Sequence, residues 1–434
     1  MKQAVILAGG KGTRLKELSR NLPKPMVPML GKPLLQHLIE QCVEYGITDI
    51  KLLVSYKKEV IENYFGDGDK YGVTIKYISE DTPRGTAGAL IDALPELDEQ
   101  FLVVYGDTFF DIDLDSFWDF HQNHAGDASI FLHPNDHPYD SDLVEVNSDF
   151  KVEKIHPYPH EKQWYQNLVN AAIYMFNKDA LQGVNLVTEK PDIAKELFPL
   201  MLESKKTIFG YISTEYIKDM GTPERLNKIE TDINSGKVKA LKKQTPKMAI
   251  FLDRDGTINQ EVNHLSSQEQ FELIDGVEEA ISQINIAGIL AIVVTNQPVI
   301  ARGELKEAEL KIIHNKMDTL LGKHGAYLDR LYYCPHHTDS GFEGEIEELK
   351  FDCDCRKPKI GLFLKAKKDL NIVLENSWVV GDTTRDILAA QNAGMKSVLV
   401  CTGQAGKDGS YKATPDFVAK DLCEAVKLIL KEIK

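Results

Sequence analysis

Short apolar runs that end in glycine- or aspartate-containing turns constrain this chain more than any other feature. The runs have the length of buried β-strands and occupy residues 4–7, 50–54, 101–105, 249–252, 290–294, 378–380 and 397–400. The stretches between them, such as 276–287, have the periodicity of amphipathic helices. Strands that alternate with helices indicate parallel sheets covered on both faces, so we expect an α/β fold.

The length and the charge of the chain limit its organisation and its ligands. A chain of 434 residues exceeds one ordinary hydrophobic core, and two domains of roughly 200 residues each are expected. The formal net charge of -15 argues against a nucleic-acid-binding surface. A phosphorylated substrate must therefore be held by local donors and metal ions.

The sequence shows no sign of membrane insertion or export. No apolar segment reaches the length of a membrane span, and residues 1–3 lead directly into an apolar run, so no signal peptide is expected. Three of the six cysteines gather in one stretch with a histidine, which is typical of a metal site more than of a disulfide framework. The reducing cytoplasm is therefore the expected compartment.

A polar, basic stretch, NSGKVKALKKQTPK at residues 234–247, is typical of a linker. We expect one domain over residues 1–240 and a second over residues 247–434. The two halves carry different motifs, so the chain contains no internal repeat. The sequence does not determine the oligomeric state, and a homo-oligomer is compatible with it.

Two loops in the N-terminal half carry groups suited to phosphate. The first apolar run leads into AGGKGTRL at residues 8–15, and LPKPM follows at residues 22–26. Glycines let backbone amides approach phosphate oxygens closely, and Arg14 and Lys24 add cations. The spacing matches neither a P-loop nor a dinucleotide-binding fingerprint.

Together these loops resemble those of the sugar-1-phosphate nucleotidyltransferases, which have a Rossmann-like sheet, and the resemblance covers residues 1–235. It implies nucleotide contacts at Leu7, Ala8, Gly9, Gly10, Gly12 and Thr13, a base-reading loop at Glu80 and Gly85, and sugar-phosphate contacts at Lys154 and Asn170. Asp107 and Asp219 match the magnesium ligands of the family. Ala172 stands where the family usually has glycine, which puts the shape of the sugar pocket in question.

The chemistry of such an enzyme needs these residue types. A sugar phosphate attacks the α-phosphate of a nucleoside triphosphate, so no protein nucleophile is required, and the barrier is largely electrostatic. Mg²⁺ held by Asp107 and Asp219, together with Arg14 and Lys24, would offset the charge. Glu80 offers only acceptors, which suits the adjacent N–H donors of guanine and favours GTP. The alternative for Glu80 is an ordinary surface position.

The C-terminal half begins with a second active-site motif. The run at 249–252 ends in Asp253-Arg254-Asp255-Gly256-Thr257, which resembles the first motif of the haloacid-dehalogenase phosphatases and implies their Rossmann-like fold. The resemblance implies that Asp253 forms an aspartyl phosphate and that Asp255 acts as acid and base. Helix caps are the alternative for isolated aspartates at strand ends.

Later motifs of the same half follow in the order of that superfamily. The resemblance implies that Thr295 and Lys357 bind the transferred phosphoryl group. It implies magnesium ligands at Asp253, Asp255 and Asp382, with Asp386 supporting them. Asn296, Arg302 and Arg356 are the expected substrate contacts.

Cysteines and one histidine just before Lys357 form a metal pattern. Cys334, His336, Cys353 and Cys355 supply three thiolates and one imidazole, the closed set of a structural Zn²⁺ site. His337 is expected to lie outside it. Such a site would stiffen the loop that carries Arg356 and Lys357. Unrelated buried cysteines beside a surface histidine are the alternative.

The segments FLDRDGTIN, TNQ, IARG, YYCPHH and CDCRKPK together resemble D-glycero-D-manno-heptose 1,7-bisphosphate 7-phosphatases over most of residues 248–434. Histidinol-phosphate phosphatases share the zinc-loop plan. Pro298 and Val299 replace the Ser-Gly that the heptose enzymes commonly have after TNQ, so the preferred sugar or anomer is in question.

The two resemblances imply one bifunctional enzyme. The C-terminal domain would remove the C7 phosphate of D-glycero-α-D-manno-heptose 1,7-bisphosphate, and the N-terminal domain would transfer GMP from GTP to heptose 1-phosphate. One alternative is a mannose-1-phosphate guanylyltransferase fused to a histidinol-phosphate-like phosphatase. Another is a nucleotide-sensing regulatory subunit, against which the retained metal-binding carboxylates argue.

Overall fold

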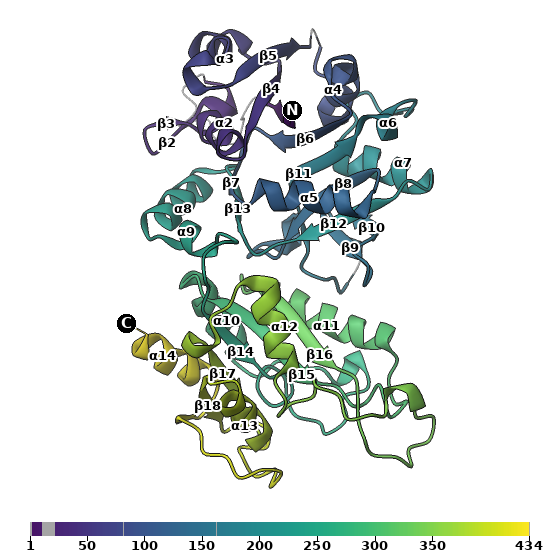
Figure 1. Cartoon of the computed structure of the whole chain (residues 1–434), viewed down its shortest axis with the longest axis vertical. Helices are drawn as coiled ribbons and strands as arrows, with labels where there is room; N and C mark the ends of the chain where they lie inside the picture. Colours follow the sequence, from purple (N-terminus) through teal and green to yellow (C-terminus); the bar gives the residue numbers. More distant parts are fainter. Residues whose placement is uncertain (1, 11–21, 81, 162, 434) are drawn as a thin grey trace. The chain divides into compact units, whose positions relative to one another are not determined.

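The computed structural model describes residues 2–10, 22–80, 82–161 and 163–433, which form two compact units (Figure 1). The first unit contains residues 1–133, 141–160 and 168–242, and the second contains 134–140, 161–167 and 243–434. Two short segments of the N-terminal half therefore belong to the second unit. No helix in the described ranges is long and apolar enough to cross a membrane.

The first unit is built on a mixed sheet. Four parallel strands lie next to one another in the order β6 (Gln100–Tyr105), β1 (Lys2–Leu7), β4 (Ile47–Val54) and β5 (Thr74–Ser79). Beyond β6 the sheet continues antiparallel through β11 (Val169–Asn177) to β9 (Leu143–Val146) and β10 (Val152–His156). β8 (Ala128–His133) also pairs with β11, and β12 (Ile208–Ile212) pairs with β8.

Alternating side chains of the central strands enter two different cores, one on each face of this sheet. Ala4 and Ile6 pack with α2 (Leu34–Glu44), whereas Val5 packs with α4 (Gly85–Ala93). Burial on both faces explains why these strands are continuous apolar runs in the sequence. The further helices of this unit are α3 (Lys58–Phe65), α5 (Leu114–His124), α6 (Lys178–Leu181), α7 (Phe198–Glu203), α8 (Pro223–Asn234) and α9 (Lys237–Leu241).

A separate two-stranded ribbon lies at the carboxyl end of β6. β7 (Thr108–Asp111) follows β6 after two residues and pairs antiparallel with β13 (Tyr216–Asp219). Thr108 stands opposite Asp219 in this pairing, and the backbone N–H of Met220 donates to the carbonyl oxygen of Asp107 at 2.8 Å. The ribbon therefore brings together two aspartates that lie far apart in the sequence.

The second unit contains a parallel six-stranded sheet. Its strand order is β16 (Arg330–Cys334), β15 (Leu290–Asn296), β14 (Ala249–Leu252), β17 (Trp378–Gly381), β18 (Lys396–Val400) and β19 (Phe417–Ala419). The order reverses between β14 and β17. In open α/β sheets the ligand site lies outside the carboxyl ends of the strands at such a point.

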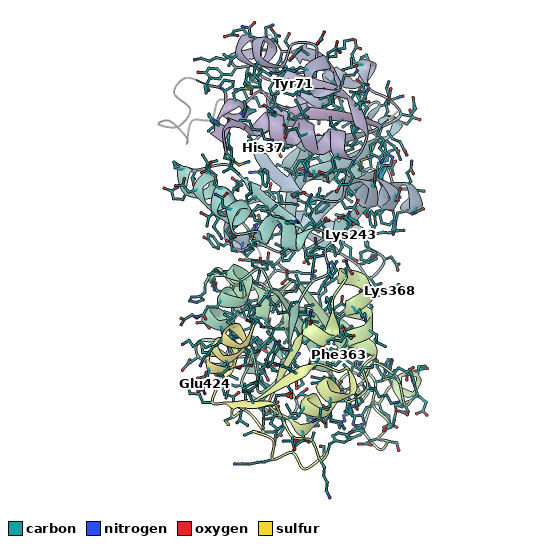
Figure 2. The ribbon with its side chains drawn as sticks, turned by 60° about the vertical axis from the view of Figure 1, so that its left-hand side comes forward. His37, Tyr71, Lys243, Phe363, Lys368 and Glu424 are labelled. Carbon is teal, nitrogen blue, oxygen red and sulfur yellow. The ribbon has the colours of Figure 1, made fainter. Side chains whose placement is uncertain are left out.

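Helices cover both faces of this second sheet. α10 (Val277–Ile286), α11 (Glu307–Gly322) and α14 (Leu422–Glu432) pack against Ile250 and Leu252 of β14. α12 (Gly361–Leu370) contributes Phe363, labelled in Figure 2, whose ring lies edge-on to that of Phe251 with centroids 5.0 Å apart. α13 (Thr384–Asn392) begins just after β17. The expected two-domain α/β class is confirmed, and each expected strand is present.

Candidate active sites

The first glycine-rich loop begins where β1 ends beside β6 and β4. The carbonyl oxygen of Leu7 accepts the N–H of Gly106 at 3.0 Å, and the N–H of Ala8 donates to the carbonyl oxygen of Leu53 at 2.8 Å. These bonds place Gly9 and Gly10 at the carboxyl edge of the sheet. Gly12, Thr13 and Arg14, which the sequence assigns to the nucleotide, lie outside the described residues.

Lys24 and Asp107 form the centre of this first site. Lys24 is only 7% exposed, and its Nζ lies 2.5 Å from Oδ2 of Asp107. Asp219 reaches the same edge through the β7–β13 ribbon, and both of its carboxylate oxygens accept from Nη1 of Arg225, at 2.6 and 2.7 Å. Two carboxylates, each balanced by a cation, therefore converge where the sequence predicts a metal and a triphosphate.

The predicted base-reading loop holds Glu80 in a defined position. Its Oε1 accepts the backbone N–H of Arg84 at 3.1 Å, and burial raises the pKa of the Glu80 carboxyl. Gly85 has a φ of +71°, and a Cβ there would lie 2.4 Å from the carbonyl oxygen of Pro191. Glycine at position 85 is therefore required by the backbone at residues 190–191 of the same chain, a reason that could not be read from the sequence.

The predicted sugar-phosphate residues lie on the antiparallel part of the sheet. Lys154 is exposed on β10, and Asn170 lies on β11. The register of β11 against β8 shifts between Asn170 and Tyr174, and Oδ1 of Asn170 accepts the N–H of Ala172 at 3.0 Å. Ala172 has a φ of +57°, in the left-handed region that favours glycine. The unusual alanine therefore lies within an irregular segment of the strand.

In the second unit, Asp253, Lys357 and Asp386 form a buried charge cluster. Nζ of Lys357 lies 2.9 Å from Oδ1 of Asp253 and 2.6 Å from Oδ1 of Asp386. Lys357 is 2% exposed and Asp386 is 0% exposed. Burial, and then the charge of Asp386, raise the pKa of Asp253. The family resemblance implied only a supporting role for Asp386, whereas the Asp386 carboxylate contacts Lys357 directly.

Asp382 adds a further carboxylate to this cluster. Oxygen atoms of Asp253, Asp382 and Asp386 lie within 4.8 Å of one another. Oδ2 of Asp382 accepts the N–H of Gln404 at 2.6 Å, while its buried Oδ1 has no hydrogen-bond partner. Burial, and then the charge of Asp253, raise the pKa of Asp382 to about 8. Three carboxylates against one ammonium, with one oxygen unsatisfied, fit a divalent cation with oxygen ligands.

The turn after β14 comes very close to Asp382. Gly256 has a φ of +74°, and a Cβ there would lie 2.3 Å from Oδ2 of Asp382. The glycine of the DRDGT motif is therefore required by this close approach.

The carboxylate of Asp255 is held outside the metal-type cluster. It accepts hydrogen bonds from Arg254, Gln297 and Asn259. Burial by itself would raise the pKa of Asp255, but the Arg254 guanidinium brings it below the ordinary value. The expected magnesium role of Asp255 therefore has no support from the position of its side chain.

Thr295 and Asn296 end the neighbouring strand β15 at this site. Oγ1 of the buried Thr295 accepts from Nε2 of Gln297 at 2.9 Å. Asn296 exchanges two hydrogen bonds with the backbone of Lys357, at 3.0 and 3.1 Å. Arg254 and Gln297 were not among the predicted site residues, although Arg254 lies between the two aspartates of the motif and both contact Asp255.

Three arginines, Arg302, Arg356 and Arg385, lie close to one another in the same unit. Nη2 of Arg302 lies 3.1 Å from Nε2 of His337, and Nη1 of Arg356 donates to the carbonyl oxygen of His336 at 3.2 Å. Burial, and then the charge of Arg385, lower the pKa of Arg356. Arg385, next to Asp386 at the start of α13, is a further cation that sequence reasoning did not identify.

The four predicted zinc ligands come together. Cys334 Sγ lies 3.5 Å from Cys353 Sγ and 3.2 Å from Cys355 Sγ, and His336 Nδ1 lies 3.2 Å from Cys355 Sγ. The four ligand atoms lie within 4.8 Å of one another, and His337 is not among them. Three sulfurs and one nitrogen at such separations fit a tetrahedral metal site.

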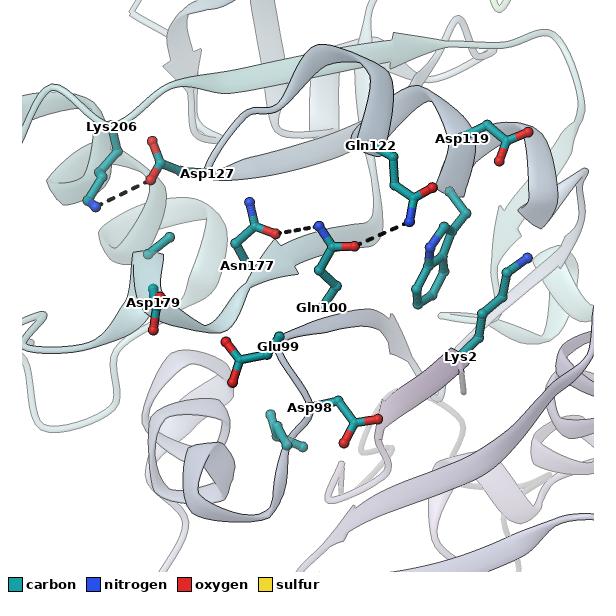
Figure 3. A pocket seen from close by; sticks show the side chains of 13 residues that line it. Lys2, Asp98, Glu99, Gln100, Asp119, Gln122, Asp127, Asn177, Asp179 and Lys206 are labelled. Atoms are coloured by element: carbon teal, nitrogen blue, oxygen red, sulfur yellow. Dashed lines mark hydrogen bonds and ion pairs between the residues drawn. The ribbon is translucent and has the colours of Figure 1, made fainter.

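A cavity of about 1040 Å³ lies elsewhere in the first unit (Figure 3). It is lined at the starts of β1 and β6 and at the end of β11, the sheet edge opposite Asp107. Its amides already bond one another, from Gln100 to Asn177 at 2.9 Å and from Gln122 to Gln100 at 3.4 Å. Because the cavity lies at the opposite edge of the sheet and its amides are already hydrogen-bonded, we do not assign it to the predicted nucleotide site.

Comparisons with known proteins match the two halves of the chain to different families. Residues 3–236 match the nucleotidyl transferase family model, and residues 354–425 match the HAD-hydrolase-like model. The D-glycero-beta-D-manno-heptose-1,7-bisphosphate 7-phosphatase of Pasteurella multocida is 44% identical over 185 residues, which are 42% of this chain and 97% of that protein.

Two further relatives match the N-terminal half. The mannose-1-phosphate guanylyltransferase of Mycobacterium tuberculosis is 33% identical over 239 residues, 54% of this chain and 65% of that protein. The crystal structure of HddC from Yersinia pseudotuberculosis complexed with GMP-PN is 28% identical and covers 54% of this chain and 100% of that chain, with a TM-score of 0.47.

Proposed function

Because the chain belongs to the nucleotidyl transferase family in its N-terminal half and to the heptose-bisphosphate 7-phosphatase family in its C-terminal half, we propose that it makes GDP-heptose in two steps. The phosphatase domain, residues 247–434, removes the C7 phosphate of D-glycero-α-D-manno-heptose 1,7-bisphosphate. The transferase domain, residues 1–240, then joins heptose 1-phosphate to GMP from GTP and releases pyrophosphate. The observation that carries the proposal is that one chain contains both charge clusters, Lys24 with Asp107 and Lys357 with Asp253.

In the phosphatase step, Asp253 is the nucleophile. One of its oxygens forms a bond to phosphorus while the bond from phosphorus to the C7 oxygen breaks, and Lys357 offsets the charge of the phosphoryl group. Asp255, ionised before substrate binds, takes the proton of the phosphate monoester monoanion and passes it to the leaving oxygen. It later takes a proton from the water that hydrolyses the aspartyl phosphate. Asp253, Asp382 and Asp386 would hold Mg²⁺, which supplies charge compensation.

In the transferase step, the sugar phosphate itself is the nucleophile. Lys24 offsets the charge of the triphosphate, and we assign Arg14 the same role. Asp107 and Asp219 would hold Mg²⁺, which supplies further charge compensation. Lys154 and Asn170 would bind the sugar phosphate, and Glu80 would accept from guanine.

The guanine base and the anomer are the finer parts of the proposal. The Mycobacterium tuberculosis relative is named a guanylyltransferase, which supports GTP. The phosphatase relatives are named for the β-anomer. We propose the α-anomer because the phosphatase is fused to a guanylyltransferase-type domain. The four-ligand cluster would hold structural Zn²⁺, and its reduced thiolates suit the cytoplasm.

The second candidate function concerns the transferase sugar. The same relative is named for mannose 1-phosphate, so a mannose-1-phosphate guanylyltransferase fused to a different sugar or histidinol phosphate phosphatase is the alternative. A nucleotide-sensing regulatory subunit fits less well, because a domain without catalysis has no need for the carboxylates of Asp107 and Asp219 beside Lys24.

The test is a phosphate-release screen over sugar bisphosphates, followed by pyrophosphate release with each nucleoside triphosphate. The α-anomer should be dephosphorylated faster than the β-anomer, and its product should react best with GTP. In the full chain, Asp253→Asn should abolish phosphate release and preserve pyrophosphate release from pre-made heptose 1-phosphate. Turnover of mannose 1-phosphate in preference to heptose 1-phosphate would support the second candidate instead.

A further inference from the structure

Arg254, between the two aspartates of the DRDGT motif, has a completely buried side chain, 0% exposed. Burying a guanidinium is costly unless its donors are paired. Its Nε donates to Oδ1 of Asp255 at 3.1 Å, and its Nη2 donates to both oxygens of Asp255, at 2.9 and 2.8 Å. The planar fork of the guanidinium therefore fixes the plane of the carboxylate.

The guanidinium is itself fixed by other elements. Nη1 of Arg254 lies 3.2 Å from Nε2 of His314 on α11, and Nη2 also donates to Oε1 of Gln297 at 3.0 Å. The backbone is fixed as well, since the carbonyl oxygen of Arg254 accepts the N–H of Ile258 at 2.8 Å and that of Asn259 at 3.1 Å. Arg254 is thus a rigid support rather than a mobile surface cation.

Gln297 joins this support to the phosphate-binding side of the site. Its Nε2 donates to Oδ2 of Asp255 and to Oγ1 of Thr295, both at 2.9 Å. Its backbone N–H donates to the carbonyl oxygen of Cys334 at 2.7 Å. Asp255 is therefore held against the end of β15 as well as against Arg254.

We propose that Arg254 is a positioning residue, which with Gln297 orients the Asp255 carboxylate toward the oxygen that leaves phosphorus. This inference rests on the proposed phosphatase function and adds a residue to it. Because every hydrogen bond to the Asp255 oxygens is donated to them, Asp255 is ionised before substrate binds and first takes the proton of the phosphate monoester monoanion. The bond from phosphorus to the sugar oxygen then breaks as the Asp253 oxygen bonds to phosphorus, and the sugar oxygen receives that proton from Asp255. A merely structural residue at this position would be served as well by an apolar side chain, without the cost of burying a charge.

The test compares two leaving groups in the full-length protein with Mg²⁺. A sugar alkoxide needs a proton as it leaves, whereas p-nitrophenolate does not. Single-turnover experiments with enzyme in excess isolate the first step, using heptose 1,7-bisphosphate and p-nitrophenyl phosphate. In Arg254→Met, release of the sugar should slow about 100- to 1000-fold, within the range of general acid catalysis (about 100- to 10,000-fold), and p-nitrophenol release should slow less than about tenfold.

Three further variants show whether the effect of Arg254→Met acts through Asp255. Asp255→Asn should show the same dependence on the leaving group. Arg254→Lys should be intermediate, because an ammonium keeps the charge without the fork. Gln297→Leu should show a smaller effect of the same kind, and it tests the idea even when Arg254→Met does not fold.

Two results would overturn the inference. Equal losses on both substrates would show that Arg254 supports the fold of the site as a whole, and wild-type rates would show that it does nothing for Asp255. If Asp255→Asn lacks the leaving-group dependence, the acid assigned in the proposed function is wrong. If only the Arg254 and Gln297 variants lack it, the positioning role is wrong and the proposed function stands.

Discussion

Asn296 and Lys357 hold each other by a reciprocal pair of hydrogen bonds. The N–H of Lys357 donates to Oδ1 of Asn296 at 3.0 Å, and Nδ2 of Asn296 donates to the carbonyl oxygen of Lys357 at 3.1 Å. Because the Asn296 side chain is hydrogen-bonded to the Lys357 backbone, the end of β15 sets the position of Lys357, which contacts Asp253.

The first prediction follows from this pair. Asn296→Ala should lower phosphatase kcat about 10- to 100-fold, because a small displacement of Lys357 misaligns the charge that it places on the phosphoryl group. Pyrophosphate release by the transferase should be unchanged. Asn285 is a matched control, since it exchanges two bonds of 3.0 Å with the backbone of Tyr327. If Asn285→Ala reduces phosphatase activity as much, loss of stability explains the effect.

Removal of one thiolate tests the metal cluster. Purified protein should contain about one Zn²⁺ per chain, and Cys353→Ser should lower that content and destabilise the second unit, because metal binding contributes to folding. Phosphatase activity should fall through a displaced Lys357 loop, with transferase activity retained. Cys423→Ser, outside the cluster, should leave the zinc content intact. Absence of zinc from protein purified without chelator would refute the assignment.

Glu80 should contribute to the choice of base. In Glu80→Gln, an acceptor oxygen is replaced by a donor that would face the N–H groups of guanine. The loss should be about 1–3 kcal/mol in transition-state stabilisation when that contact is buried. The kcat/KM for GTP should fall, while that for UTP or dTTP stays flat or rises. An unchanged preference for GTP would remove Glu80 from the nucleotide site.

Replacing Ala172 with glycine should relieve the strain of its left-handed backbone conformation. An L-residue in this region costs about 1–2 kcal/mol, and glycine loses part of that gain because its unfolded chain is more flexible. Ala172→Gly should therefore stabilise the first unit by roughly 0.5 kcal/mol in denaturant unfolding. Ala125, with a φ of +48° at the end of α5, is the control. Ala125→Gly should stabilise similarly, but only Ala172→Gly should alter KM for the sugar phosphate.

Asp318 on α11 should make the stability of the second unit depend on pH. Burial raises the pKa of Asp318 to about 7, although its Oδ2 accepts the N–H of Asn167 at 3.1 Å. The native state therefore keeps a proton that the unfolded state loses above about pH 4, so stability falls as pH rises from about 4 to about 7. Asp318→Asn keeps an acceptor and should remove this dependence, with a stabilisation of about 1–4 kcal/mol at pH 8. Parallel pH profiles of unfolding for variant and wild type would contradict the assignment.

The sequence by itself determined the strands and the residues at their ends. Lys24 and Asp107 lie 83 positions apart and Asp253 and Lys357 lie 104 apart, yet the motifs predicted that each pair shares a site, and each pair is in contact. Such predictions work because parallel strands are buried on both faces and their carboxyl ends meet at one edge. The grouping of Cys334, His336, Cys353 and Cys355 was also predicted from the sequence, because thiols and an imidazole at this spacing are typical of a metal site.

Only the tertiary structure decided which groups these residues face. Gly85 is required by the carbonyl oxygen of Pro191, and Gly256 by the carboxylate of Asp382. Ala172 takes a left-handed backbone within a shift of strand register. Arg254 is adjacent to Asp255 in the chain, but its burial depends on His314, a residue from another element. Local sequence encodes periodicity and turn chemistry, whereas the close approach of distant segments is set by packing and leaves no local pattern.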